Sequence, residues 1–134
     1  LSKAGGALPK LSLPISWGIG APIGSGRQSI SWIHLDDLVK MFVFVVERKV
    51  KGIYNAVTHN TTNAFMTKAI AKQLKKPLFL PNIPSFILKI IFGEMSKLIL
   101  GGNRVSGIKI IEKGFKADYP TLEVALSDIF RKVD

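Results

Sequence analysis

The segment from residue 18 to residue 38, GIGAPIGSGRQSISWIHLDDL, constrains the fold of this chain more than any other. Residues 18–26 contain four glycines and one proline, a composition that predicts turns. Residues 29–33 alternate between polar and apolar side chains, which predicts a strand. Asp36 or Asp37 is then placed to cap a helix, because a carboxylate accepts hydrogen bonds from the free amides of a first turn. A turn, a strand and a helix are therefore expected in immediate succession.

The next two segments, residues 38–46 and 52–57, predict how the chain is connected. Residues 38–46 are almost continuously apolar, which predicts a helix buried on nearly all sides. Residues 52–57, GIYNAV, are typical of a short buried strand. The order of strand, helix and strand predicts a βαβ unit with parallel pairing and places the chain in the α/β class.

The rest of the chain is predicted to be mostly helical with a few short extended pieces, so that the isolated chain has α+β character. A short helix interrupted near Pro14 is expected within the first sixteen residues. Four further helices are expected: from Thr61 or Thr62 to Leu74, from Ser85 to about Leu100, around residues 108–111, and from Leu122 to Phe130.

Composition narrows the class of protein. A length of 134 residues fits one domain, and the absence of cysteine excludes disulfides, thiolate catalysis and cysteine-ligated metals and suits a cytoplasmic protein. The net charge of +10 would favour binding to nucleic acid or to an anionic membrane. However, the cations are scattered, and the short clusters at residues 47–51 and 75–76 lie at predicted helix ends, where they offset the helix dipole. We expect a solvated basic surface and neither a nucleic-acid nor a membrane partner.

Mean hydropathy is high, at +0.27, which indicates a very apolar interior or an apolar surface meant for a partner. Residues 86–100, FILKIIFGEMSKLIL, are the most apolar candidate for such a surface. The stretch is too short and too charged to span a bilayer. Core packing is its first interpretation, and an interfacial or partner-facing helix is the alternative.

Several residues could carry chemistry, and each has a structural alternative. The sequence GSGR at residues 24–27 could cradle a phosphate, although a turn with an exposed arginine fits it better. His34 beside Asp36 could suggest acid–base or metal chemistry, but two histidines and no cysteine predict no metal site. Trp32 could line a pocket or fill the core, and Asn55 could hold a backbone turn or a ligand; the sequence leaves both open.

Together these pieces resemble the C-terminal half of an atypical extended short-chain dehydrogenase/reductase. The chain is most similar to bacterial epimerase-family proteins that end in a small domain of unassigned function. The run WIHLDDL at residues 32–38 is the most specific match. The other matching residues occur in order along the chain: Leu1-Ser2, Gly5-Gly6-Ala7, GSGRQ at 24–28, GIYN at 52–55, residues 63–65, FGEM at 92–95, Gly114-Phe115, YPTLE at 119–123 and Ala125-Leu126.

The resemblance implies a division of labour between two halves of a longer protein. In such proteins an N-terminal Rossmann domain binds NAD or NADP, and a Tyr-x-x-x-Lys pair performs the chemistry. Neither feature occurs here, since Thr58 follows Tyr54 by four positions and Glu123 follows Tyr119 by four. The chain is therefore expected to be the substrate-binding C-terminal portion of an NAD(P)-dependent nucleoside-diphosphate-sugar epimerase-like protein or reductase. It would contribute no catalytic residue and bind no cofactor alone, and residues 35–57 would pack on the Rossmann domain.

The resemblance also suggests roles for single residues. Arg27, Gln28 and Trp32 are expected to contact a small-molecule substrate, while His34, Asp36 and Asn55 would orient the segment. Sugar-nucleotide epimerases of this superfamily often carry a phosphate-binding arginine four residues before the histidine, where this chain has Ile30. A less anionic substrate is therefore expected. The alternative function is a non-enzymatic protein-interaction module, because similar proteins have been labelled cell-division inhibitors.

Overall fold

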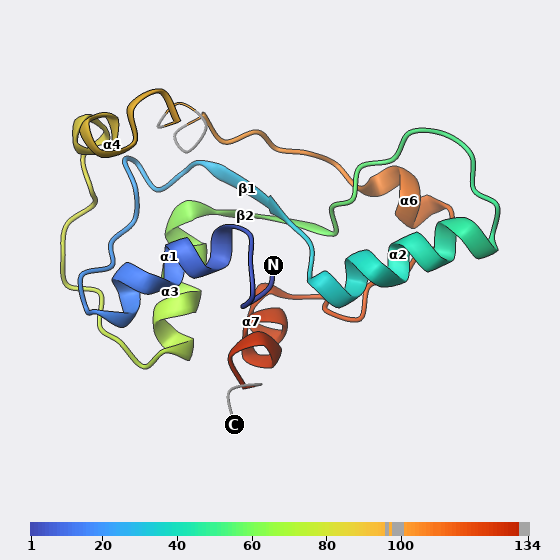
Figure 1. Ribbon diagram of the computed structural model, residues 1–134, viewed down its shortest axis with the longest axis horizontal. Helices are drawn as coiled ribbons and strands as arrows, with labels where there is room; N and C mark the ends of the chain where they lie inside the picture. The colour runs from blue at the N-terminus through green and yellow to red at the C-terminus, as the bar shows by residue number, and fades with distance from the viewer. Residues whose placement is uncertain (96, 98–100, 132–134) are drawn as a thin grey trace.

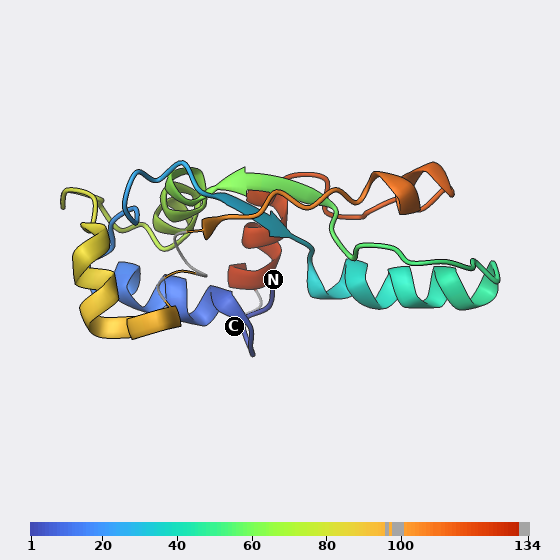
Figure 2. The same cartoon turned by 90° about the horizontal axis from the view of Figure 1, so that it is seen from above.

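The computed structural model describes residues 1–95, 97 and 101–131, and these form a body and a projecting arm (Figures 1 and 2). We use the term arm for residues 35–57 and 107–117. The body contains α1 (Ala7–Ser16), β1 (Ser29–Trp32), β2 (His59–Thr62), α3 (Asn63–Gln73) and α7 (Leu122–Arg131). The arm contains α2 (Leu35–Glu47) and α6 (Ile108–Glu112), and the end of the body away from the arm carries α4 (Ser85–Phe92) and the short 3₁₀ helix η1 (Gly93–Met95).

The body is held together by apolar side chains from its three helices and from β1. Trp32 is buried among them at the end of β1. The arm has a second, smaller core of Met41, Ile110 and Phe115. The main buried cluster comprises Leu8, Ile15, Trp32, Met66, Ala69, Ile70, Ala71, Leu122, Ala125, Leu126 and Ile129.

The sheet differs from the predicted parallel unit. β1 forms where it was predicted, but its partner is β2, and the two strands are antiparallel, with Trp32 opposite His59. The predicted strand at residues 52–57 is wrong, since this segment forms no strand and Ile53 is 93% exposed. The start of α3 determines the pairing, because the amides of Asn63 and Ala64 donate to the carbonyls of residues 28 and 26. The residues just before α3 are therefore the ones that pair with β1 as a strand.

Helix α2 forms as predicted, but its capping residue and its burial differ from the predictions. It begins at Leu35, and His34 caps it instead of Asp36 or Asp37. The prediction of burial on nearly all sides is also wrong within this chain, because only Asp37 and Met41 of the helix are buried. The side chains of Val39, Phe42, Val43 and Val46 are between 49% and 75% exposed.

The remaining helices follow the predictions with two corrections. Helix α1 is not interrupted at Pro14, because proline in the last turn removes a single helical hydrogen bond near the end of the helix. The α-helix from Ser85 ends at Phe92, since the φ of 55° at Gly93 does not fit a right-handed α-helix. Residues 96 and 98–100 of that predicted helix lie outside the described residues. Helices α3, α6 and α7 form as predicted, and within the described ranges no helix is long and apolar enough to cross a membrane.

Candidate functional site

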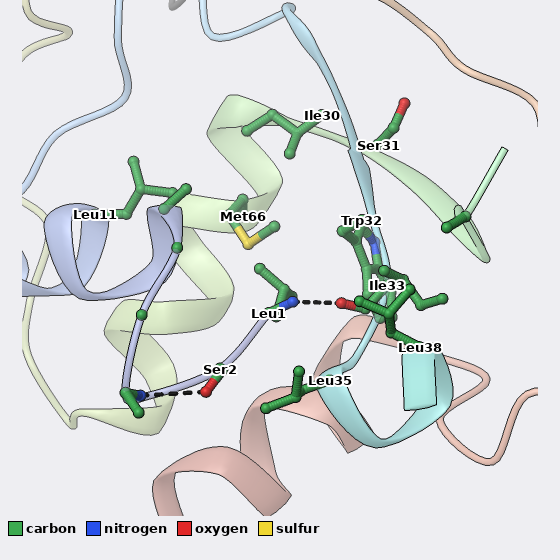
Figure 3. A pocket seen from close by; sticks show the side chains of 15 residues that line it. Leu1, Ser2, Leu11, Ile30, Ser31, Trp32, Ile33, Leu35, Leu38 and Met66 are labelled. Carbon is green, nitrogen blue, oxygen red and sulfur yellow. Dashed lines mark hydrogen bonds between the residues drawn. The ribbon is translucent and has the colours of Figure 1, made fainter. Parts of the chain in front are cut away.

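A pocket of about 570 Å³ lies where the first residues of the chain pass beside β1 and the start of α2 (Figure 3). Leu11 enters it from α1, Ile30 and Trp32 from β1, and Met66 from α3. Leu35 from α2 lies at its other side. The side chains that line this pocket include no ionisable group.

Local backbone contacts hold this pocket together. The Leu1 amino group donates to the carbonyl of Ile33, and the Leu35 amide donates to the Leu1 carbonyl at 3.0 Å. These bonds fix the start of the chain against the end of β1. Trp32 is only 4% exposed, and its ring lies against His59 with 5.2 Å between centroids. The indole therefore serves both the core and the pocket wall.

His34 lies next to this pocket and connects three segments. Its Nδ1 accepts a hydrogen bond from the Asp36 amide at 3.2 Å and so caps α2. Its ring stacks on Tyr119 with 3.7 Å between centroids, and its Nε2 lies 3.6 Å from a carboxylate oxygen of Asp128 on α7. Burial lowers the pKa of His34, while the carboxylates of Asp36, Asp128 and Asp37 oppose that shift.

The two aspartates of the WIHLDDL run bind the segment that leads into α7. Asp37 is fully buried, and its carboxylate accepts from the amides of Asp118 at 2.7 Å and Tyr119 at 3.2 Å. The Tyr119 hydroxyl donates to Asp36 at 3.3 Å. We call His34, Asp36, Asp37 and Tyr119 the junction, since they join the arm to the body.

The carboxylates around His34 raise the question of a metal ion. Ligand atoms of His34, Asp36 and Asp128 lie within 4.8 Å of one another, and no other such group of three occurs in the part of the chain that the structure describes. Two of the polar atoms already have partners, since Nδ1 of His34 accepts from an amide and Asp36 accepts from Tyr119. The arrangement is that of a hydrogen-bonded junction, and we propose no metal there.

Two of the predicted substrate contacts lie away from the pocket. Arg27 is exposed and follows a turn in which the Gly26 amide donates to the Ile23 carbonyl at 2.9 Å. Gln28 donates from its Nε2 to the same carbonyl at 2.9 Å, so it braces that turn. Neither is among the residues that line the pocket, whereas Trp32 is.

Asn55 lies on the exposed loop of the arm and donates to the Ser106 carbonyl at 3.0 Å. It therefore ties the loop of residues 48–58 to the segment before α6. Sequence reasoning missed Tyr119, Asp128 and the role of Asp37. No local signal marks these residues, because Asp37 and its partners are separated by 81 and 82 positions.

Comparison with known proteins relates the chain to one group of them. Residues 83–129 match the family model of a domain of unknown function (DUF1731). The chain is 36% identical over 132 residues to epimerase family protein SDR39U1 of Mus musculus, covering 96% of this chain and 45% of that protein. It is 40% identical over 126 residues to epimerase family protein YfhF of Bacillus subtilis, covering 92% of this chain and 41% of that protein.

The fold has a similar solved counterpart. A crystal structure of human epimerase family protein SDR39U1 (isoform 2) with NADPH matches with a TM-score of 0.90 and 32% identity. The match covers 99% of this chain and 46% of that one. The fold is thus a mixed arrangement of helices and a small sheet that also occurs in an epimerase family protein. This chain is related to the epimerase family proteins and corresponds to their C-terminal part, which confirms the resemblance predicted from the sequence.

Proposed function

We propose that this chain is the substrate-binding C-terminal portion of an NAD(P)-dependent epimerase-like protein or reductase. The observation that carries the proposal is the match over 99% of the chain to a structure that was crystallised with NADPH. The chain spans less than half the length of these relatives, so the cofactor and the catalytic groups would belong to the other half. NADP is the better supported cofactor, because the nucleotide in the human crystal structure is NADPH.

The arm supports this proposal because it carries an apolar face. Phe42 and Val46 on α2 are 65% and 75% exposed, and Ile53 on the following loop is 93% exposed. Full burial of one large apolar side chain contributes about 1.5–3 kcal/mol, so covering this face with another domain would be favourable. We propose that residues 35–57 pack on the cofactor-binding domain.

The pocket beside β1 is our candidate for the substrate site, with Trp32 as the predicted substrate contact in its wall. Arg27 and Gln28 stay predicted contacts outside the pocket wall. Ile30 lines the pocket at the position where sugar-nucleotide epimerases often carry arginine, which favours a less anionic substrate. His34, Asp36 and Asn55 are proposed to orient the segment, and the cytoplasmic location stays a prediction of the composition.

A chimera tests this function. This chain would replace the C-terminal part of human SDR39U1, and NADPH binding would be measured by nucleotide fluorescence, followed by NADPH oxidation with a panel of carbonyl compounds. We expect a folded chimera that binds NADPH. The variant Phe42→Asp should prevent assembly, while Ile90→Asp on α4 is the matched control because Ile90 is 78% exposed and lies outside the arm. A folded chimera that binds no NADPH would contradict the proposal.

The protein-interaction module is the less supported alternative. The exposed side chains of Phe86 and Ile90 on α4 are compatible with it. The relatives, however, are named as epimerase family proteins, and their similarity covers nearly all of this chain. We therefore favour the enzyme portion.

A further inference from the structure

The pocket beside β1 contrasts with the rest of the chain in its charge. The chain carries 19 lysines and arginines, yet no lining side chain of this pocket is ionisable. A phosphate ester that leaves water needs cations or free amides to replace its hydration. The lining side chains supply no cation for a nucleoside diphosphate.

Several hydroxyl and carbonyl groups at the pocket are committed to partners within the chain. The Ser31 hydroxyl donates to Asn60 at 2.6 Å and accepts from the Val105 amide at 2.9 Å. The Trp32 carbonyl accepts from both the amide and the hydroxyl of Thr58. The Ser2 hydroxyl accepts from the Ala4 amide at 3.2 Å and keeps its own proton for donation. A ligand here would gain its affinity mainly from buried apolar surface.

The size and the wall of the pocket suit a small molecule. Its volume of about 570 Å³ lies within the usual range of small-molecule sites, roughly 300–1,000 Å³. Leu11, Ile30 and Met66 line the pocket from three different elements (Figure 3). Met66 adds a flexible, polarizable thioether, a side chain that adapts to irregular apolar ligands.

We propose that this pocket binds an uncharged, largely apolar small molecule and rejects sugar nucleotides. The inference rests on the proposed function only in taking that molecule as the substrate. The class follows from lining side chains that are apolar and carry no charge, from the paired hydroxyl of Ser31 and the paired carbonyl of Trp32, and from a volume of small-ligand size.

The test uses an uncharged aromatic fluorophore, N-phenyl-1-naphthylamine, and uridine diphosphate as the anionic competitor. The chain has two tryptophans, and Trp17 is 67% exposed. In a Trp17→Phe background, energy transfer to the bound fluorophore therefore comes from Trp32 in the pocket wall. We expect saturable energy transfer that uridine diphosphate does not displace.

Substitutions locate the binding. Ile30→Arg should weaken fluorophore binding by about tenfold or more, because a cation in the pocket must be desolvated without a partner. Ile90→Arg, which adds the same charge on exposed α4, should change it by less than about twofold, as expected for a distant site. If Ile30→Arg does not fold, Leu35→Gln takes its place and should likewise weaken fluorophore binding. Leu35 lines the pocket but is 45% exposed, so this position tolerates a polar side chain.

Three results would overturn the proposal: displacement of the fluorophore by uridine diphosphate, equal affinity in folded Ile30→Arg and Ile90→Arg, or loss of fluorophore binding in the folded chimera with the N-terminal part of human SDR39U1. The last result would mean that the other half of the protein covers the pocket. NADPH binding by the same chimera reports separately on the proposed function, so the two can fail independently.

Discussion

Asp37 provides the sharpest test of how the arm is attached to the body. Its carboxylate is fully buried and accepts two backbone amides from residues 118 and 119, at 2.7 and 3.2 Å. A hydrogen bond to a charged group contributes about 1.5–3 kcal/mol, and a buried donor left without a partner costs a similar amount. Asp37→Asn keeps one acceptor oxygen, but it places an NH₂ group against the second amide. We expect the free energy of unfolding to fall by about 2–4 kcal/mol.

The assay is urea unfolding followed by circular dichroism, together with hydrogen exchange of the Asp118 and Tyr119 amides. Asp36→Asn is the matched control, because it removes the same charge one position away from a side chain that is 56% exposed. It should cost about 1 kcal/mol or less, since the amide oxygen still accepts from the Tyr119 hydroxyl. Equal losses in the two variants, or unchanged protection of both amides in Asp37→Asn, would refute the attachment that we derive from the geometry.

Three further predictions concern pH, backbone space and the exposed arm. Burial lowers the pKa of His34 below 6.5, so the unfolded chain binds more protons than the folded chain at acid pH. The contribution of His34 to the free energy of unfolding should therefore be fully present above about pH 6.5 and be lost as the pH falls through the lowered pKa. The variant His34→Asn, which can still cap α2, should lack this pH-dependent contribution when stability is measured across a pH series. Gly26→Ala should destabilise the chain by about 1–3 kcal/mol in thermal unfolding, because φ is +70° and a new Cβ would lie 2.9 Å from that of Ala64, whereas Gly5→Ala meets open space and should change stability by less than about 0.5 kcal/mol. Phe42→Ser should leave the stability of this chain within about 0.5 kcal/mol, since Phe42 is 65% exposed; a larger loss would show that this chain already buries the α2 face.

Elements coded by local signals could be predicted from the sequence. Helix α3 begins after Thr62, whose hydroxyl accepts from the Phe65 amide, and a threonine before an apolar run indicates such a cap. β1 likewise follows from alternation within five residues. β2 could not be predicted in this way, because its sequence HNTT is polar and its pairing depends on the contacts of α3 with residues 26 and 28.

The residues of the candidate site also divide into those predictable from local sequence and those that depend on distant contacts. Trp32 was expected to line a pocket or fill the core, and it does both. The cap of α2 was assigned to an aspartate because carboxylates are the commoner caps, whereas the histidine that precedes the helix supplies the acceptor. The partners of Asp37 lie more than eighty positions away, so no local pattern could reveal them.

The junction and the arm together give the WIHLDDL run at residues 32–38 two structural roles. The strand half of the run contributes Trp32 to the pocket wall, and the polar half fixes the first turn of α2 on the segment before α7. The apolar face of α2 continues from that fixed turn along the same helix. A rigid attachment at one end therefore sets the direction in which the whole face points.

Substitutions at Asp37 should thus weaken assembly with a cofactor-binding domain even though Asp37 is buried and does not line the pocket. In the chimera with human SDR39U1, Asp37→Asn should lower NADPH binding at temperatures where the variant is still folded, while Asp36→Asn should not. Normal NADPH binding by folded Asp37→Asn would show that the junction stabilises this chain without orienting its arm.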